Sequence, residues 1–279
     1  MLKGVNQWCF PEGYPLERVF EVSREAGYDA VELNVNPEGG VGLTMETTAA
    51  EAEQIGRLAR QYGLQLRSIS TSLLWRHPLS SDDAAVREQG GRIVRKQLEL
   101  AELLGADTVL VVPGAVNEAT SYDACYERSL KELNGLAREA EQRGVRIGVE
   151  NVWNKFLLSP LEMKQYVDSI DSPNVGVYFD VGNILAYGFP QQWIRILGAR
   201  IFKIHVKDFR PGVGTGQGFV PLLAGDVNWP EVRAALQEIG YTDTLTAEIG
   251  RYAADPLQAV YDTSHHLNVI IGKERHSEV

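Results

Sequence analysis

The chain has only two cysteines among 279 residues and no long uninterrupted apolar run. Cys9 and Cys125 match neither a zinc-knuckle spacing nor a disulfide framework, so we expect both to be small buried groups. No run approaches the ~18 apolar residues of a membrane span. The first residues, MLKGVNQWCFPEG, lack the apolar region of a signal peptide. These absences predict a cytoplasmic protein that does not bind a membrane.

Positive charge is also in the minority. The chain has 27 Lys and Arg against 37 Asp and Glu, a net charge of −10 and an isoelectric point near 5.1. This balance disfavours nucleic acid or an anionic membrane surface as the main partner. No Pro- or Ser-rich linker interrupts the chain, so we predict one domain over residues 1–279.

Short apolar runs alternate with longer segments of helical periodicity. The predicted strands cover residues 2–9, 30–35, 64–70, 108–114, 145–150, 175–180, 200–206 and 244–249. The predicted helices cover residues 15–26, 46–62, 81–104, 121–143, 159–170, 191–197, 230–239 and 256–271. Eight strand–helix pairs in about 280 residues are typical of a (β/α)8 TIM barrel. A doubly wound sheet would more often carry a Gly-rich phosphate loop after its first strand, and none is present.

The third predicted helix has two local features of its own. Ser81 is the predicted N-cap, with Asp82 and Asp83 in the first turn, where the helix dipole favours negative charge. Gly90 and Gly91 lie inside this helix and are expected to kink or break it.

Four polar side chains follow or end four consecutive predicted strands: Glu150, Asp180, His205 and Glu248. The C-terminal ends of barrel strands meet at one mouth, so these side chains should converge there. Three carboxylates cannot be held together unless they bind protons or a cation. With one imidazole they form a ligand set for a divalent metal, and oxygen-rich ligands favour Mn²⁺, Mg²⁺ or Co²⁺ over a thiolate-type zinc site.

The motifs around these positions resemble a known family, the sugar phosphate isomerases and epimerases of the xylose-isomerase-like TIM-barrel superfamily. They are GVENVWN at 148–154, YFDVGN at 178–183, KIHVKD at 203–208, LAGDVNW at 223–229 and AEIG at 247–250. Within the superfamily the chain looks most like ketose 3-epimerases of the L-xylulose-5-phosphate 3-epimerase or hexulose-6-phosphate isomerase type. The resemblance implies a sugar or sugar-phosphate substrate and a homo-oligomer.

The resemblance also implies a mechanism. Glu150, Asp180, His205 and Glu248 would hold one divalent metal, with Mn²⁺ favoured and Co²⁺, Mg²⁺ or Zn²⁺ as alternatives. The metal would polarise the substrate carbonyl and stabilise a cis-enediolate. Glu150 and Glu248 would be the acid/base pair on opposite faces of that intermediate, in an order the sequence does not assign. Proton return to the other face gives C3 epimerisation, and return to the adjacent carbon gives aldose–ketose isomerisation.

Five further residues are candidates with open alternatives. Asn183 falls where some free-ketose epimerases carry a substrate-contacting His, a departure that weakens transfer of their pocket. Arg210 would reach a substrate oxygen or phosphate, or be a solvated loop residue. Trp75 and His77 would line the pocket or belong to ordinary loop packing. Glu32, at the end of the second strand, would orient His205 or pair with a basic neighbour.

Other functions remain in view. The glycine-rich loop from Pro211 would bind phosphate or form a mobile lid. Inosose isomerases, hydroxypyruvate isomerases and 3-keto-sugar lyases or dehydratases use a similar barrel. An endonuclease-IV-like nuclease would need several more metal-binding histidines, whereas His265, His266 and His276 lie in the final helix and tail. A non-catalytic sugar-binding barrel would not need two opposed glutamates.

Overall fold

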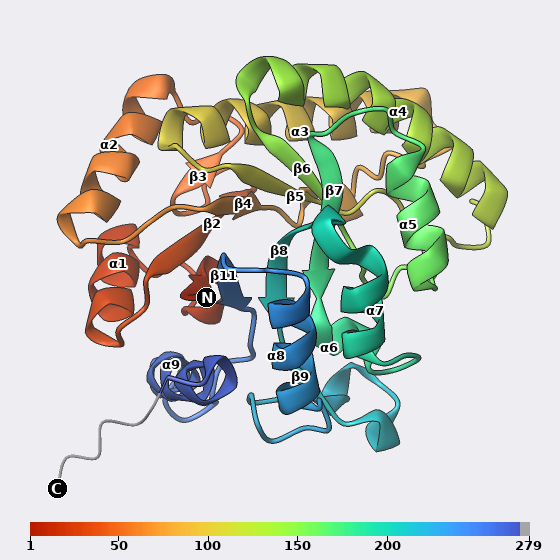
Figure 1. Cartoon of the computed structure of the whole chain (residues 1–279). Helices are drawn as coiled ribbons and strands as arrows, with labels where there is room; N and C mark the ends of the chain where they lie inside the picture. Colours follow the sequence, from red (N-terminus) through yellow and green to blue (C-terminus); the bar gives the residue numbers. More distant parts are fainter. Residues whose placement is uncertain (274–279) are drawn as a thin grey trace, which may run out of the picture.

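The computed structural model describes residues 1–273 and shows eight parallel strands closed into a ring (Figure 1). Around the ring they are β1 (Leu2–Asn6), β2 (Ala30–Asn36), β4 (Ser68–Ser70), β5 (Thr108–Val111), β6 (Arg146–Glu150), β7 (Val175–Asp180), β8 (Ile201–Val206) and β11 (Thr244–Ala247). β1 pairs with both β2 and β11, which closes the sheet. The predicted (β/α)8 barrel is confirmed.

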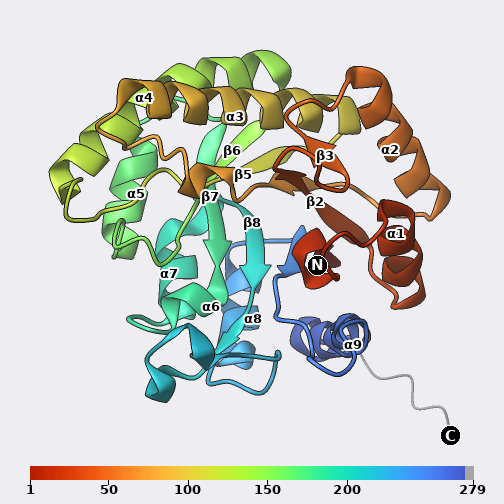
Figure 2. The ribbon, with the colours of Figure 1, turned by 180° about the vertical axis from the view of Figure 1, so that it is seen from behind.

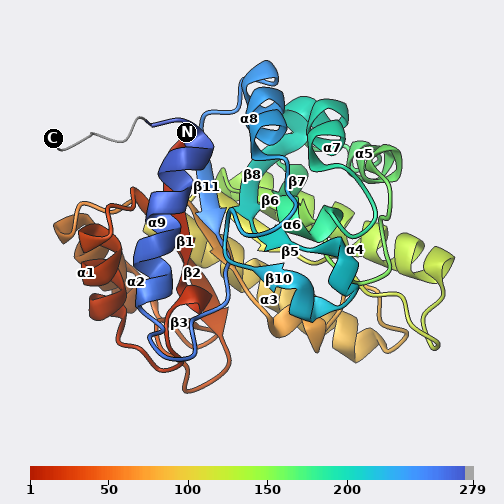
Figure 3. The same cartoon turned by 90° about the horizontal axis from the view of Figure 1, so that it is seen from below.

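Helices cover the outside of this ring, as the views from opposite sides show (Figures 1 and 2). They are α1 (Leu16–Glu25), α2 (Ala49–Gln61), α3 (Ala84–Leu104), α4 (Tyr122–Arg143), α5 (Pro160–Asp168), α7 (Pro190–Leu197), α8 (Trp229–Glu238) and α9 (Gln258–Ile271), with a one-turn helix α6 (Val181–Ile184) directly after β7. In Figure 3, α9 lies beside β1 and completes the outer layer. Within residues 1–273 every helix is too short or too polar to cross a membrane. His276 lies outside the described residues.

Several predicted boundaries are wrong, each for a local reason. β1 ends at Asn6 rather than residue 9, because the Asn6 side chain accepts a hydrogen bond from the Trp8 backbone at 2.7 Å and starts a 3₁₀ turn. The third predicted strand shortens to Ser68–Ser70, with one isolated bridge at Gln65. The glycine-rich loop carries a small antiparallel hairpin of β9 (Asp208–Phe209) and β10 (Phe219–Val220). The short strand β3 (Leu43–Thr44) adds to β2.

Helix α3 also differs from the prediction. Its N-cap is Asp83 rather than Ser81, and the Asp83 carboxylate accepts from the Ala85 backbone at 2.8 Å. Gly90 and Gly91 do not break the helix, which runs unbroken over Ala84–Leu104. A Cβ at Gly90 would collide with the His77 carbonyl oxygen, so the glycine permits close packing of the preceding loop.

The interior of the barrel differs in character from the shell around it. The large apolar core packs between the strands and the helices. Side chains alternate along each strand, so on β8 Ile204 and Val206 face the helices while Lys203 and His205 face the axis. Along the axis the structure places a chain of buried polar groups and only a small apolar cluster of Leu110, Val112 and Tyr178. Cys9 and Cys125 are both buried, as expected.

An ionic cluster fills the end of the barrel opposite the mouth. The fully buried Lys203 ammonium lies 2.9 Å from Asp107 Oδ1 and 2.5 Å from Asp243 Oδ2. Arg67 completes the cluster, with Nη2 2.6 Å from Asp243 Oδ2. Burial opposes ionisation of Asp243, but hydrogen bonds from Arg67 and Lys203 outweigh it and lower its pKa to about 2. Ionised Asp243 therefore stabilises the fold.

This cluster predicts an acid-dependent loss of stability. Because the folded-state pKa of Asp243 is depressed, its contribution is present above about pH 4 and is lost as the pH falls toward 2. Asp243→Asn should lower the free energy of unfolding by about 3 kcal/mol at pH 7, because it leaves Lys203 short of a partner. Urea unfolding at several pH values should show this difference shrinking below pH 4. A difference that stays constant down to pH 2 would contradict the assignment.

Candidate active site

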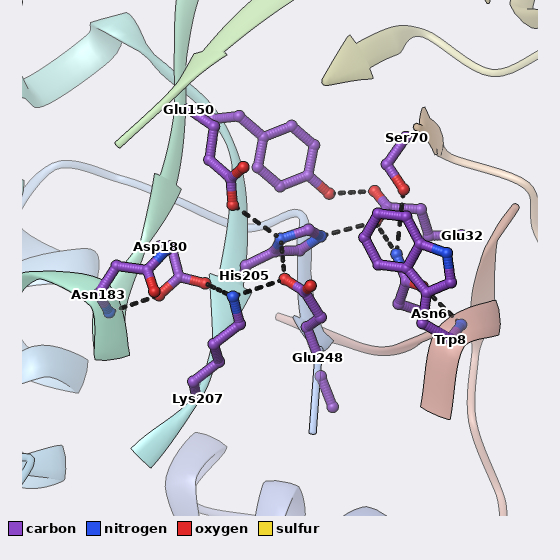
Figure 4. Close-up of polar contacts among 12 residues, drawn as sticks. Asn6, Trp8, Glu32, Ser70, Glu150, Asp180, Asn183, His205, Lys207 and Glu248 are labelled. Carbon is purple, nitrogen blue, oxygen red and sulfur yellow. Dashed lines mark hydrogen bonds and ion pairs between the residues drawn. The ribbon is translucent and has the colours of Figure 1, made fainter. Parts of the chain in front are cut away.

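The four predicted ligands meet at the mouth of the barrel (Figure 4). Glu150 and Asp180 end β6 and β7, His205 is the penultimate residue of β8, and Glu248 directly follows β11. Asp180 and His205 are direct partners across the β7–β8 ladder. One ligand atom from each of the four residues lies within 4.8 Å of the others. Parallel strands of one closed ring thus bring residues nearly 100 positions apart into one cluster.

Glu32 fixes the orientation of the His205 ring. His205 Nε2 lies 2.6 Å from Glu32 Oε1, so Nε2 carries the hydrogen of this bond. The other ring nitrogen, Nδ1, then points at the carboxylates of Glu248 and Glu150, at 3.0 and 3.4 Å. Glu32 lies inside β2 rather than at its end, which corrects the predicted position. The predicted contact with His205 is nevertheless present.

The Glu32 carboxylate is held by an extended polar network. Asn6 Nδ2 donates to it at 2.6 Å, Ser68 Oγ at 2.5 Å, and the Tyr178 hydroxyl donates as well. Burial opposes ionisation, but His205, Ser68 and Tyr178 lower the pKa of Glu32. The ionised, fully bonded Glu32 is therefore a fixed acceptor for the imidazole.

We expect Glu32→Gln to weaken Mn²⁺ binding by about 10–100-fold, because a neutral amide holds His205 less firmly in the required tautomer. Isothermal titration calorimetry on apo protein measures this change. Ser68→Ala is the matched control, since it removes one donor to Glu32 but keeps the carboxylate, and its effect should be smaller. Unchanged affinity in Glu32→Gln would remove Glu32 from any role in the site.

Lys207 is a site residue that the sequence interpretation missed. Its ammonium lies 2.8 Å from Glu248 Oε2 and 3.2 Å from Asp180 Oδ2, between the two carboxylates in Figure 4. The alternation of side chains along a strand could have indicated it. Lys207 is two residues beyond His205 and therefore continues the series of β8 side chains that face the barrel axis.

The carboxylates of the cluster have different proton affinities. Burial raises the pKa of Glu150 to about 7 and also raises that of Asp180. Glu248 is subject to burial too, but Lys207 and then His205 lower its pKa below the ordinary value. Burial disfavours the charged form of His205, yet Glu32, Glu150 and Glu248 together raise its pKa well above the usual range. The cluster therefore attracts positive charge strongly.

The donor set fits a divalent cation. Among the described residues, His205 Nδ1 and Asp180 Oδ2 are buried atoms that make no hydrogen bond; their polar contacts are only the ion-pair contacts to Glu248 and Glu150 and to Lys207, and both atoms face the cluster. Buried polar atoms are rarely left without a partner. A cation bound by Asp180, His205, Glu150 and Glu248 would satisfy both atoms. Three carboxylates and one imidazole suit Mn²⁺, Mg²⁺ or Co²⁺ and are also compatible with Zn²⁺.

One cavity borders the cluster, and a second cavity shares Trp8 with it. The first cavity, of about 260 Å³, is lined by Lys207, Glu248, Phe219 and Trp8, with Asp208, Val220, Ile249 and Gly250. A second cavity of about 630 Å³ is lined by Trp8, Glu12 and Arg251, among other residues. Trp8, which follows β1, lines both cavities and was also missed. Of the four candidate ligands, Glu248 lines the smaller cavity.

Asp208 organises the loop that borders the smaller cavity. Its fully buried carboxylate accepts hydrogen bonds from the backbone of Leu223 at 2.9 Å and Val227 at 3.2 Å, and from Trp229 Nε1 at 3.0 Å. A Cβ at Gly225 would collide with the Asp208 carboxylate. The loop after β8 is thus anchored at its base, so Phe219 and Lys207 have defined positions.

The four remaining candidate residues, Asn183, Arg210, Trp75 and His77, lie away from the two cavities. The Asn183 amide is buried and donates to the Asn151 carbonyl at 3.0 Å. Arg210 Nε donates to the Ala224 carbonyl at 2.9 Å, within its own loop. Trp75 is 47% exposed. His77 packs its backbone against Gly90. None of the four lines either of the two cavities described above.

Comparison with known proteins assigns the fold family. Residues 20–269 match the xylose isomerase-like TIM barrel family, and the chain belongs to it. SgbU of Escherichia coli (strain K12), provisionally named an L-ribulose-5-phosphate 3-epimerase, is 28% identical over 82% of this chain and 81% of its own. L-Ribulose-5-phosphate 3-epimerase UlaE of Salmonella paratyphi C (strain RKS4594) is 25% identical over 90% of this chain and 88% of its own.

Solved structures with the same fold include two informative cases. A D-psicose 3-epimerase crystallised in the presence of D-fructose superposes with a TM-score of 0.82 at 19% identity, covering 98% of this chain and 100% of its own. The IOLI protein with a bound zinc atom superposes with a TM-score of 0.80 at 18% identity, covering 99% of this chain and 100% of its own. These likenesses show the shared fold.

Proposed function

We propose that the chain is a divalent-metal-dependent isomerase that epimerises a ketose or ketose phosphate at C3. The observation that carries this proposal is the convergence of Glu150, Asp180, His205 and Glu248 within 4.8 Å at the barrel mouth. The names of the relatives, which are ketose-phosphate 3-epimerases, support the same reaction class. Mn²⁺ is the proposed ion, and Zn²⁺ is the main alternative because the IOLI structure holds zinc.

When bound, the cation would act as a Lewis acid on the substrate carbonyl and a neighbouring hydroxyl oxygen. The chain's own residues would carry the protons. One of Glu150 and Glu248 would take the proton from C3, and the C–H electron pair would move into a planar enediolate. The other glutamate would return a proton to the opposite face of C3, which inverts that carbon. Epimerisation is reversible, so each glutamate would serve as base in one direction and as acid in the other.

Other residues would hold this pair in place. Glu32 would keep His205 in one tautomer through the 2.6 Å contact at Nε2. Trp8 and Phe219 border the cavity next to Glu248 and would shield the intermediate from water. An endonuclease-like activity is less well supported, because within residues 1–273 the candidate metal ligands form one cluster with a single histidine. A homo-oligomer stays a prediction, with light scattering as its test.

The test is a substrate screen in deuterated water. Free and phosphorylated pentuloses and hexuloses are incubated with the Mn²⁺-loaded protein, and NMR follows the C3 epimer and deuterium at C3. We expect both to appear together for at least one ketose, and turnover limited to phosphorylated ketoses would assign the sugar-phosphate class. Deuterium at C1 or C2 with an aldose product would indicate aldose–ketose isomerisation. The absence of deuterium from every substrate would contradict the proposal.

A further inference from the structure

Lys207 is the cation closest to the candidate metal ligands. Its ammonium contacts Glu248 Oε2 at 2.8 Å and Asp180 Oδ2 at 3.2 Å, and the side chain is 17% exposed. The ammonium also lies 5.8 Å from the centre of the Phe219 ring, on the wall of the smaller cavity. Lys207 therefore lies within the cluster, on its cavity side.

The position of Lys207 is built into the backbone. On one side, a Cβ at Gly182 would come within 2.5 Å of Lys207 Cβ and 2.9 Å of its carbonyl, so the glycine makes room for this segment. On the other side, the carboxylate of the next residue, Asp208, is fixed by the backbone of Leu223 and by Trp229. A lysine on a loosely held loop would lack such constraints on both sides.

The charges around the cluster define what Lys207 does. Glu150, Asp180 and Glu248 carry −3 when ionised; Glu32 and His205 contact each other and are counted apart from these three. The Lys207 ammonium brings the set to −2, the charge that one divalent ion neutralises. Charges at about 4 Å interact by several kcal/mol in a partly buried site. Lys207 therefore stabilises the carboxylates without the ion and repels the ion when it enters.

We propose that Lys207 is an internal counter-cation that holds Asp180 and Glu248 together before the metal binds and sets the metal affinity. This inference rests on the proposed metal-dependent function. It makes Lys207 a positioning residue whose removal tightens metal binding, the opposite of what removal of a ligand does. The ammonium keeps the affinity moderate and the empty cluster folded.

The experiment compares apo wild-type protein, Lys207→Met and Lys207→Arg by titration calorimetry with Mn²⁺ in the absence of substrate. Lys207→Met should bind Mn²⁺ about tenfold more tightly or better, and Lys207→Arg should stay within a few-fold of wild type. The melting temperature of apo Lys207→Met should fall, and Mn²⁺ should raise it more than in wild type. Lys131→Met, which removes one exposed charge from α4, is the matched control and should leave the affinity unchanged.

Equal or weaker Mn²⁺ binding by Lys207→Met would overturn the proposal. If this variant does not fold, Lys207→Gln is measured with the same expectation. His205→Asn separates the two claims. If wild type binds Mn²⁺ and His205→Asn does not, an unchanged affinity in Lys207→Met rejects only the role of Lys207. If wild type does not bind Mn²⁺, or His205→Asn binds it equally well, the metal site itself is rejected and this inference with it.

Discussion

Glu150→Gln and Glu248→Gln are each expected to lower kcat by about 10²–10⁴-fold and to abolish exchange of the substrate C3 proton with solvent. Glutamine keeps the shape and one ligand oxygen of glutamate but cannot accept the proton. Burial raises the pKa of Glu150 to about 7, whereas Lys207 favours ionised Glu248, so the two environments differ as a pair of proton carriers requires.

The measurement is deuterium incorporation at C3 by NMR, at saturating Mn²⁺ so that weaker metal binding does not mask the result. Glu12→Gln is the matched control, because it removes a carboxylate that lines the larger cavity outside the cluster. It should retain most of the activity. Exchange that persists in both Glu150→Gln and Glu248→Gln would reject their role as the proton-transfer pair.

Removal of the metal is expected to have the other large effect. Thorough chelation should lower epimerase activity by at least about 100-fold, and added Mn²⁺ should restore it. Chelation should also lower the melting temperature, because an ion at 100 times its Kd stabilises the native state by about 2.7 kcal/mol. Without an ion, His205 Nδ1 and Asp180 Oδ2 make no hydrogen bond and keep only their ion-pair contacts.

His205→Asn is the companion variant for this experiment. It removes the imidazole that lies between Glu32 and the carboxylates of Glu150 and Glu248. We expect that added Mn²⁺ will raise neither the activity nor the melting temperature of this variant to the wild-type level. A chelated wild-type protein that keeps full activity, or a His205→Asn variant that Mn²⁺ restores to the wild-type level, would contradict metal dependence through this residue.

The barrel and the cluster were predictable because both depend on repetition. Eight strand–helix pairs in the sequence predict a closed ring of strands. In such a ring the C-terminal ends of the strands lie at one mouth. Glu150, Asp180 and Glu248 lie at or directly beyond the ends of their strands, and His205 is one residue from the end of β8. Their convergence therefore follows from topology, without knowledge of side-chain contacts.

Side-chain contacts that depend on how the strands pack could not be predicted from sequence patterns. Glu32 lies in the middle of β2, and its donors Asn6, Ser68 and Tyr178 come from three other strands. Such a network depends on the register of the strands relative to one another around the ring. The hydrophobic periodicity of the sequence does not predict this register. Lys207 was missed because it lies one residue past the end of β8. The sequence prediction did not continue the alternation of axis-facing and helix-facing side chains beyond the strand.

Loop residues were the weakest predictions. Arg210 was expected either to reach the substrate or to be a solvated loop residue; in the structure it is exposed and its Nε donates to the Ala224 carbonyl. Asp208 decides the shape of this loop through hydrogen bonds to Leu223, Val227 and Trp229, up to 21 residues away in the chain. Side-chain to backbone bonds over such distances leave no local periodic signal.

The central claim is that one divalent ion binds where β6, β7, β8 and β11 end. The most direct measurement is an anomalous difference map at the manganese edge from crystals grown with Mn²⁺. We predict a single strong peak within bonding distance, about 2.0–2.3 Å, of oxygen atoms from Glu150, Asp180 and Glu248 and of His205 Nδ1. A well-ordered mouth without a peak, or a peak away from these residues, would contradict the claim.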